Sequence, residues 1–146
     1  MIYIDEEKKV FHLQSKNTSY IIGLLPSKHL GQVYYGEILD INNEVSNLKP
    51  KHNIEVGSQV IYDKDDKTFN LNLAFLELPT YGKGDFREPM LHFRFKDGSR
   101  TSDFVYLKHE VISKPFFKEM PETKAYKEEI ETLIITMRDK VKNIEV

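Results

Sequence analysis

Residues 81–91, YGKGDFREPML, crowd two glycines, an aspartate, an arginine, a glutamate and a proline between two strand-like stretches. Gly82 and Gly84 permit a sharp bend, because glycine has no side chain to restrict its backbone. Asp85 and Arg87 follow, and an arginine guanidinium can bind a carboxylate or hydroxyl groups through parallel hydrogen bonds. We interpret the stretch as a loop shaped for contact with a partner. The alternative is that Asp85 and Arg87 hold the loop to its own domain.

The other ionisable residues show no catalytic or metal-binding pattern. Asp63, Asp65 and Asp66 lie close together, but a calcium loop needs a glycine at its sixth position and a distal glutamate. The histidines lack the HxxxH and HExxH spacings of zinc sites, and G-x-S-x-G is absent. The histidines are His12, His29, His52, His92 and His109. We therefore predict no catalytic residue, no metal site and no cofactor.

Tyrosines provide a second candidate contact surface. Tyr34 and Tyr35, together with Tyr81, could form an aromatic platform for a sugar ring, since a tyrosine combines an apolar face with a polar hydroxyl. Neighbouring residues on a strand point to opposite faces of the sheet, so one of Tyr34 and Tyr35 should lie in the core. We keep Tyr35 and Tyr81 as candidate contact residues.

Composition limits the classes of partner. The chain has 146 residues with 40% hydrophobic content, which corresponds to one domain over residues 1–146. Its net charge is only -2 and its basic residues are dispersed, so it offers no basic surface for nucleic acid or an anionic membrane. It has no cysteine, no signal-peptide pattern and no apolar run near the ~20 residues that span a bilayer. We predict a cytoplasmic protein without a nucleic-acid or membrane partner.

Alternating apolar residues predict an all-β protein with an antiparallel β-sandwich fold. The expected strands are residues 2–5, 10–15, 18–25, 30–36, 69–78, 90–95, 101–112, 131–139 and 143–146. The Asp-Gly pair within residues 96–99 predicts a hairpin that joins 90–95 to 101–112, with Phe104 and Tyr106 on one face.

Two polar stretches separate these strands. Residues 40–58 are expected to form a loop, and residues 113–129 an extended connector with room for a short helix at 124–129. The final strand, 143–146, begins just before the chain stops. We interpret this as a truncated domain in which the partners of the last strand lie beyond Val146.

Two segments are specific in their residue types, YGKGDFREP and LGQVYYG, and MPET, DGSRTSDFVYLKHEV and ETLIITMRD add to them. Together these segments resemble, in the same order, the start of bacterial α-galactosidases of glycoside hydrolase family 36. The resemblance implies that this chain opens an N-terminal β-supersandwich domain. In that family a (β/α)8 barrel with an aspartate nucleophile and an aspartate acid/base follows, and then a smaller C-terminal β-domain. Residues 43–58 depart from the family pattern, because this stretch is shorter and lacks the usual His-Leu pair.

The resemblance also implies a function. The intact enzyme is expected to hydrolyse terminal α-galactosides such as melibiose and raffinose with retention of configuration, and its catalytic aspartates lie on the barrel. This part of the chain is then expected to serve oligomerisation and active-site shaping, with its own barrel and neighbouring subunits as partners. The candidate substrate-binding or interface residues are Tyr81, Asp85, Arg87 and Tyr35. The alternative is a free-standing β-sandwich module that binds carbohydrate or protein without catalysis.

Overall fold

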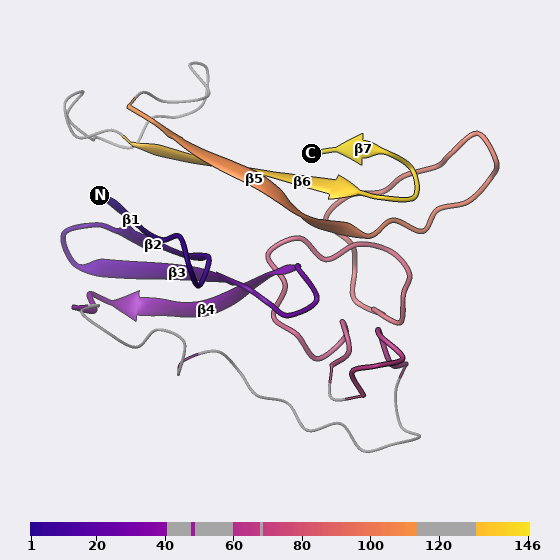
Figure 1. Ribbon diagram of the computed structural model, residues 1–146, viewed down its shortest axis with the longest axis horizontal. Coiled ribbons are helices and arrows are strands. Elements are labelled where there is room, and N and C mark those ends of the chain that lie inside the picture. The colour runs from indigo at the N-terminus through magenta and orange to yellow at the C-terminus, as the bar shows by residue number, and fades with distance from the viewer. Residues whose placement is uncertain (41–47, 49–59, 68, 114–130) are drawn as a thin grey trace.

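The computed structural model describes residues 1–40, 48, 60–67, 69–113 and 131–146. Within these residues the chain forms two antiparallel sheets that lie as separate layers (Figure 1), with the strand orders β1-β2-β3-β4 and β5-β6-β7. The strands are β1 (Ile2–Asp5), β2 (Val10–Gln14), β3 (Thr18–Leu24), β4 (Leu30–Glu37), β5 (Phe104–Ile112), β6 (Thr132–Asp139) and β7 (Ile144–Glu145). The predicted all-β class is confirmed.

The first sheet consists of successive hairpins, as the sequence predicts. In the β1–β2 turn, the Asp5 carboxylate accepts a hydrogen bond of 2.9 Å from the Lys8 backbone N–H, and Lys9 has a positive φ of 48°. In the β3–β4 turn, the Lys28 N–H donates to the Leu25 carbonyl at 2.8 Å. In the β1–β2 turn the aspartate side chain takes the role of a missing backbone acceptor, which stabilises the reversal of the chain.

The second sheet contains the longest pairing in the described chain, between β5 and β6. After β6, the Asp139 carboxylate accepts hydrogen bonds from the N–H groups of Val141 (2.8 Å) and Lys142 (3.0 Å) and closes a turn. β7 then pairs back onto β6 through Asp139 and Ile144. The Asp139 turn thus gives the last strand a partner within the chain on one side, and β7 is an edge strand of the second sheet.

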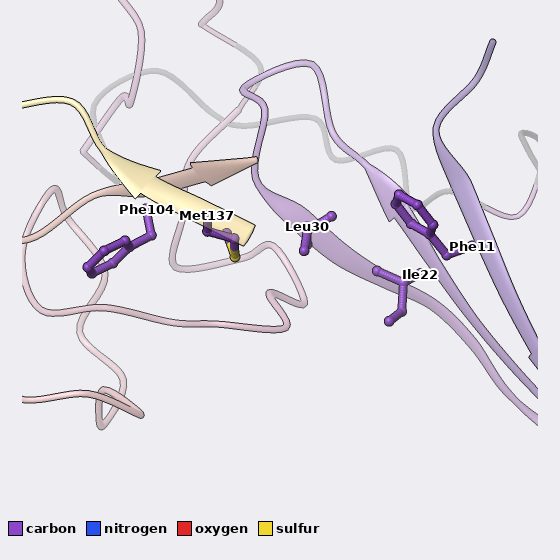
Figure 2. Packing of buried hydrophobic residues seen from close by; sticks show 5 residues of the cluster. All are labelled: Phe11, Ile22, Leu30, Phe104 and Met137. Carbon is purple, nitrogen blue, oxygen red and sulfur yellow. The ribbon is translucent and has the colours of Figure 1, made fainter. Parts of the chain in front are cut away.

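One apolar cluster joins the two sheets (Figure 2). Its buried members are Phe11, Ile22 and Leu30 from the first sheet and Phe104 and Met137 from the second. Burying a side chain of this size stabilises the fold by about 1.5–3 kcal/mol. Tyr106 packs against the same cluster as Phe104, as their predicted common face requires. The sheets thus form the predicted β-sandwich.

Residues 69–78 are not a strand, contrary to the prediction. A turn occupies residues 71–73, and the Asn70 side-chain oxygen accepts a hydrogen bond of 2.8 Å from the Leu73 N–H. Asparagine side chains compete with sheet pairing in this way. Leu76 makes an isolated bridge to Gly31 of β4. This irregular segment therefore runs along the edge of the first sheet.

Residues 90–95 are not a strand either. Leu91 forms one isolated bridge with Thr80. The predicted turn at residues 96–99 is present, since the Gly98 N–H donates to the Phe95 carbonyl at 2.9 Å and Gly98 has a φ of 80°. However, the turn does not pair residues 90–95 with β5. The strand that pairs with β5 is β6, which forms an antiparallel ladder along almost the whole length of β5.

Two predictions fall largely or wholly outside the described residues. They are the loop over residues 40–58 and the connector over residues 113–129 with its short helix at 124–129.

Candidate functional site

The candidate contact loop forms a tight hairpin at its tip. Gly82 and Asp85 make an antiparallel bridge, and the Asp85 N–H donates to the Gly82 carbonyl at 3.1 Å. The two central residues have positive φ angles, 57° at Lys83 and 84° at Gly84. These are the φ values of a type I′ turn, in which glycine is favoured because it carries no Cβ. The glycines of the sequence motif therefore define the shape of the loop.

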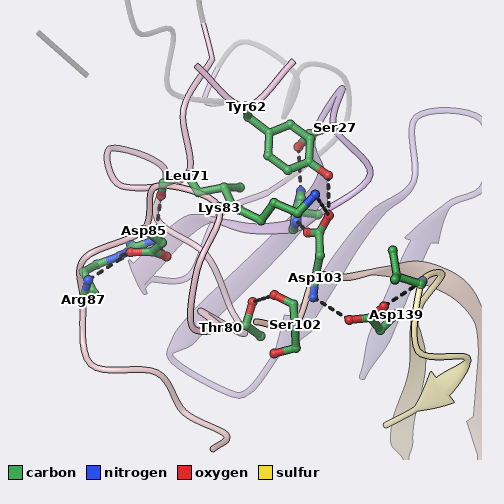
Figure 3. Close-up of polar contacts among 12 residues, drawn as sticks. Ser27, Tyr62, Leu71, Thr80, Lys83, Asp85, Arg87, Ser102, Asp103 and Asp139 are labelled. Carbon is green, nitrogen blue, oxygen red and sulfur yellow. Dashed lines mark hydrogen bonds and ion pairs between the residues drawn. The ribbon is translucent and has the colours of Figure 1, made fainter. Parts of the chain in front are cut away.

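An arginine holds this hairpin to the neighbouring segment (Figure 3). Arg87 pairs with both carboxylate oxygens of Asp85, from Nε to Oδ1 at 2.9 Å and from Nη2 to Oδ2 at 2.7 Å. The same guanidinium donates to the Ala74 carbonyl at 2.6 Å and the Leu71 carbonyl at 2.7 Å. The Asp85 side chain is only 1% exposed. We call this arrangement of Asp85, Arg87 and the two carbonyls the arginine staple.

The arginine staple leaves an aromatic surface on the loop. All three guanidinium nitrogens of Arg87 donate within the chain, which supports the alternative that Asp85 and Arg87 hold the loop to its own domain. Tyr81 is 53% exposed and Phe86 is 79% exposed. The hairpin therefore presents two aromatic side chains to solvent together with the charged Lys83 and Glu88, whereas its strongest polar pair faces inward.

Asp103 lies beside the same hairpin, on the side of Tyr81 and Lys83. Its carboxylate accepts hydrogen bonds from His29 Nε2 at 2.8 Å and the Tyr62 hydroxyl at 2.9 Å, and it lies 3.8 Å from the Lys83 ammonium (Figure 3). The neighbouring Ser102 N–H donates to the Tyr81 carbonyl at 3.1 Å. The hairpin is thus attached at two points, through Arg87 after the turn and through Tyr81 and Lys83 to the Ser102–Asp103 segment.

These contacts set the charge state of the Asp103 group. Burial raises the pKa of the Asp103 carboxyl, but the hydrogen bonds from His29 and Tyr62 and the nearby Lys83 charge outweigh it, so the net pKa is lowered. Burial and the bond to Asp103 raise the pKa of Tyr62. Sequence reasoning missed this junction, because His29 and Asp103 are 74 residues apart and no local motif links them.

A cavity of about 250 Å³ opens beside Asp103. Its lining includes Ser27, Tyr62, Val105, Asp139 and Val141. Several of its polar groups already have partners in the chain, since Ser27 bonds to His29 Nδ1 at 2.9 Å and Asp139 accepts the Asp103 N–H at 2.8 Å. We interpret the cavity as a structural junction between the Ser102–Asp103 segment and the β6–β7 turn.

The structure does not bring Tyr35 and Tyr81 together. Tyr34 packs against the small cluster of Val10 and Ile21, whereas Tyr35 is 69% exposed, as their opposite orientation predicts. The Tyr35 ring meets the edge of Tyr20, with the centroids 5.8 Å apart. It is the other end of β4 that pairs with the segment beside the hairpin, through Gly31. Tyr35 and Tyr81 therefore belong to separate surfaces.

The other histidines lie apart from one another. His12 bonds to Ser19, His92 to Glu88 and His109 to Tyr106 and Glu6; His52 lies outside the described residues. The part of the chain that the structure describes contains no group of three or more His, Asp or Glu side chains placed to hold a metal ion. No helix among the described residues is long and apolar enough to cross a membrane.

Comparison with known sequences defines the class of protein. The sequence profile of the glycosyl hydrolase family 36 N-terminal domain matches residues 28–146. The chain therefore belongs to this family.

Individual relatives agree with this assignment. Over 142 residues the chain is 30% identical to α-galactosidase AgaA of Geobacillus stearothermophilus, covering 96% of this chain and 19% of that protein. The crystal structure of the Lactobacillus brevis α-galactosidase superposes with a TM-score of 0.86 at 25% identity, covering 99% of this chain and 19% of that one. A structure of an AgaA variant in complex with raffinose superposes with a TM-score of 0.80 at 30% identity, covering 94% and 19%. The chain spans about a fifth of the length of the curated relatives.

Proposed function

We propose that the chain is the opening part of an α-galactosidase that hydrolyses short α-galactosides such as raffinose and melibiose. The observation that carries this proposal is the match of nearly the whole chain, in sequence and in fold, to the same small part of α-galactosidases. One of the similar structures is an α-galactosidase variant in complex with raffinose. The absence of cysteine suits the reducing interior of a cell, where we place the enzyme.

The chemistry of such an enzyme is assigned to the rest of its chain. Retaining hydrolysis requires two carboxyl groups about 5–5.5 Å apart, one that attacks the sugar carbon and one that protonates the leaving oxygen. The buried carboxylates described in this structure already have other partners: Asp85 is paired with Arg87, Asp103 with His29, and Asp139 with turn N–H groups. This domain therefore serves assembly and the shaping of the active site, through contacts with its own catalytic domain and with neighbouring subunits.

The hairpin of residues 81–91 is the proposed contact element. Tyr81 contributes exposed aromatic surface, while Asp85 and Arg87 act by holding the hairpin in one conformation. A hairpin that is ordered before it meets its partner loses less conformational entropy on binding. Tyr35 is proposed as a contact residue on a second surface, at the far end of β4.

The proposal is tested by expressing the α-galactosidase that carries this chain at its N-terminus. We expect it to release galactose from raffinose, and proton NMR should show the α-anomer as the first product, because two successive inversions retain configuration. If raffinose and melibiose are both left intact while the protein is folded, the proposal is wrong. A module that binds carbohydrate or protein without catalysis then becomes the better explanation.

A further inference from the structure

We propose that the apolar side chains around the arginine staple form the surface on which the catalytic part of the α-galactosidase docks, with Phe86 at its centre. This inference rests on the proposed function. It assigns the contact to a group of residues that includes neither Asp85 nor Arg87. We call the group the apolar rim: Leu73, Phe75, Tyr81, Phe86 and Met90.

The apolar rim concentrates exposed hydrophobic area in a short part of the chain. Fifteen large hydrophobic side chains are exposed among the described residues, and five of them lie between Leu73 and Met90. Phe75 is 61% exposed, Met90 is 63% exposed and Phe86 is 79% exposed. Single exposed hydrophobic residues are common on protein surfaces, but a group of them marks a surface that another molecule covers.

The arginine staple holds the two halves of the rim together. Arg87 binds the carbonyls of Leu71 and Ala74, so the segment that contains Leu73 and Phe75 is fixed against the hairpin. The Phe86 N–H donates to the Asn72 side-chain oxygen at 3.2 Å, which adds a second link between the same two segments. The two irregular segments that carry the rim residues are therefore fixed against each other.

Phe86 lies between the two residues of the buried ion pair. Asp85 and Arg87 both turn toward the protein, and Phe86 between them is the most exposed phenylalanine of the described chain. A large aromatic side chain on a rigid element is typical of the few residues that carry most of the energy of an interface. The hairpin thus presents Phe86 in a fixed position before any partner binds.

The chemistry of the rim favours a protein over a sugar as the partner. Recognition of a sugar needs free polar groups beside the aromatic rings to fix its hydroxyls. Here the Asp85 carboxylate is buried, the Arg87 nitrogens already donate to oxygens of this chain, and the exposed Glu88 and Lys83 are paired with His92 and Asp103. Leu73 and Met90 add aliphatic area, and interfaces between proteins are enriched in methionine and aromatic residues.

The catalytic part of the same enzyme is the occupant to which we commit. The family profile describes an N-terminal domain, and the relatives are about five times as long as the segment that this chain matches. A domain of that kind has the following part of its own chain beside it at very high effective concentration. The apolar rim is therefore more readily covered by the catalytic part of the same chain than by any other protein.

Methionine oxidation tests the coverage of the rim directly in the intact enzyme. In this chain Met90 and Met1 have similar exposures, 63% and 68%. With dilute hydrogen peroxide and peptide mass spectrometry, we expect Met90 to oxidise roughly tenfold more slowly than Met1 in the α-galactosidase, because reactivity follows exposure. Equal rates for the two methionines overturn the proposal. Raffinose hydrolysis by the same sample separates this failure from a failure of the proposed function.

A pair of variants tests the role of Phe86. Phe86→Ser should lower the unfolding temperature of the intact enzyme by several degrees but leave that of the 146-residue chain within about 1 °C, because Phe86 has few contacts in its own domain. Val141→Ser, at an 80% exposed position in the β6–β7 turn, is the matched control and should change neither protein. An equal effect of Phe86→Ser on both proteins, or no effect on the intact enzyme, overturns the proposal.

Discussion

Arg87 forms a two-point ion pair with Asp85, with Nε 2.9 Å from Oδ1 and Nη2 2.7 Å from Oδ2, although the two residues are separated by only Phe86 in the sequence. The remaining capacity of the guanidinium is directed to the carbonyls of Leu71 and Ala74. A single side chain thus fixes both the tip of the hairpin and its attachment to the neighbouring segment.

Replacing Arg87 should destabilise the domain itself. Arg87→Ala leaves the buried Asp85 carboxylate without its cation, and removing one member of a fully buried pair costs about 3–5 kcal/mol. Because the Arg87 side chain is 33% exposed, solvent screens part of this, and we expect a loss of about 2–3 kcal/mol in the free energy of unfolding.

Urea denaturation of the isolated chain measures this loss. Arg94→Ala, at an exposed position, is the control and should change the free energy of unfolding by less than about 0.5 kcal/mol. Arg87→Lys should recover only part of the loss, since an ammonium cannot reproduce the paired contacts. Equal stability of wild type and Arg87→Ala contradicts the staple.

Two glycines with similar backbone angles should respond differently to alanine. Gly84 and Gly98 have φ values of +84° and +80°, so a Cβ brings a conformational cost of about 1–2 kcal/mol at either position. At Gly84 the new Cβ lies 2.5 Å from Val60 Cβ, whereas at Gly98 it meets nothing within 4 Å. We expect Gly84→Ala to lower the unfolding temperature clearly more than Gly98→Ala in calorimetry. Equal effects refute the close contact between the hairpin and Val60.

Because of His12, the free energy of unfolding of the domain should decrease as the pH is lowered below neutral. Burial lowers the pKa of His12 from its ordinary value of 6.5, and the N-terminal charge adds to this effect. The unfolded chain then binds a proton more readily than the folded chain, so the free energy of unfolding decreases as the pH falls from above 6.5.

Unfolding temperatures of His12→Gln and wild type between pH 8 and pH 5 test this. The variant should show a smaller decrease, whereas His92→Gln, at a side chain that is 70% exposed, should behave as wild type. If the unfolding temperature of His12→Gln decreases with pH as much as that of wild type, groups other than His12 cause the effect.

Asp103 should account for part of the loss of stability in acid. Its pKa is lowered in the folded chain despite burial, because His29 and Tyr62 donate to the carboxylate. Its contribution is therefore complete above the ordinary pKa of 3.8 and is lost as the pH falls through the lower folded value. Asp103→Asn should be less stable than wild type at pH 6, and the difference should shrink at low pH. A constant difference in chemical denaturation across that range contradicts this assignment.

The hairpins of the first sheet could be predicted from the sequence because all their information is local. Strands β1 to β4 pair with their neighbours in the chain, and turn-forming residues separate them. The segment 69–78 misleads for the opposite reason, since its apolar alternation does not correspond to one buried face. Leu71 is 2% exposed but Phe75 is 61% exposed, because the Asn70 turn and the Arg87 contacts determine the backbone there.

The same distinction applies to the candidate site. Asp85 and Arg87 are two residues apart, so their types and spacing already suggest an ion pair. Asp103 meets His29 and Tyr62 across 74 and 41 residues, and only the completed sandwich brings these three together. The exposure of Phe86 could not be predicted either, because it follows from the inward direction of the residues on both sides of it.

The central claim is that this domain supplies contacts and not catalysis to an α-galactosidase. The most direct test compares galactose release from raffinose by the isolated 146-residue chain and by the enzyme that carries it, at equal molar concentration. We expect all turnover in the longer protein and none above buffer in the isolated chain, because we assign the carboxylate pair that retaining hydrolysis needs to the rest of the enzyme. Turnover by the isolated chain that survives repurification, or its absence in the folded longer protein, contradicts the account.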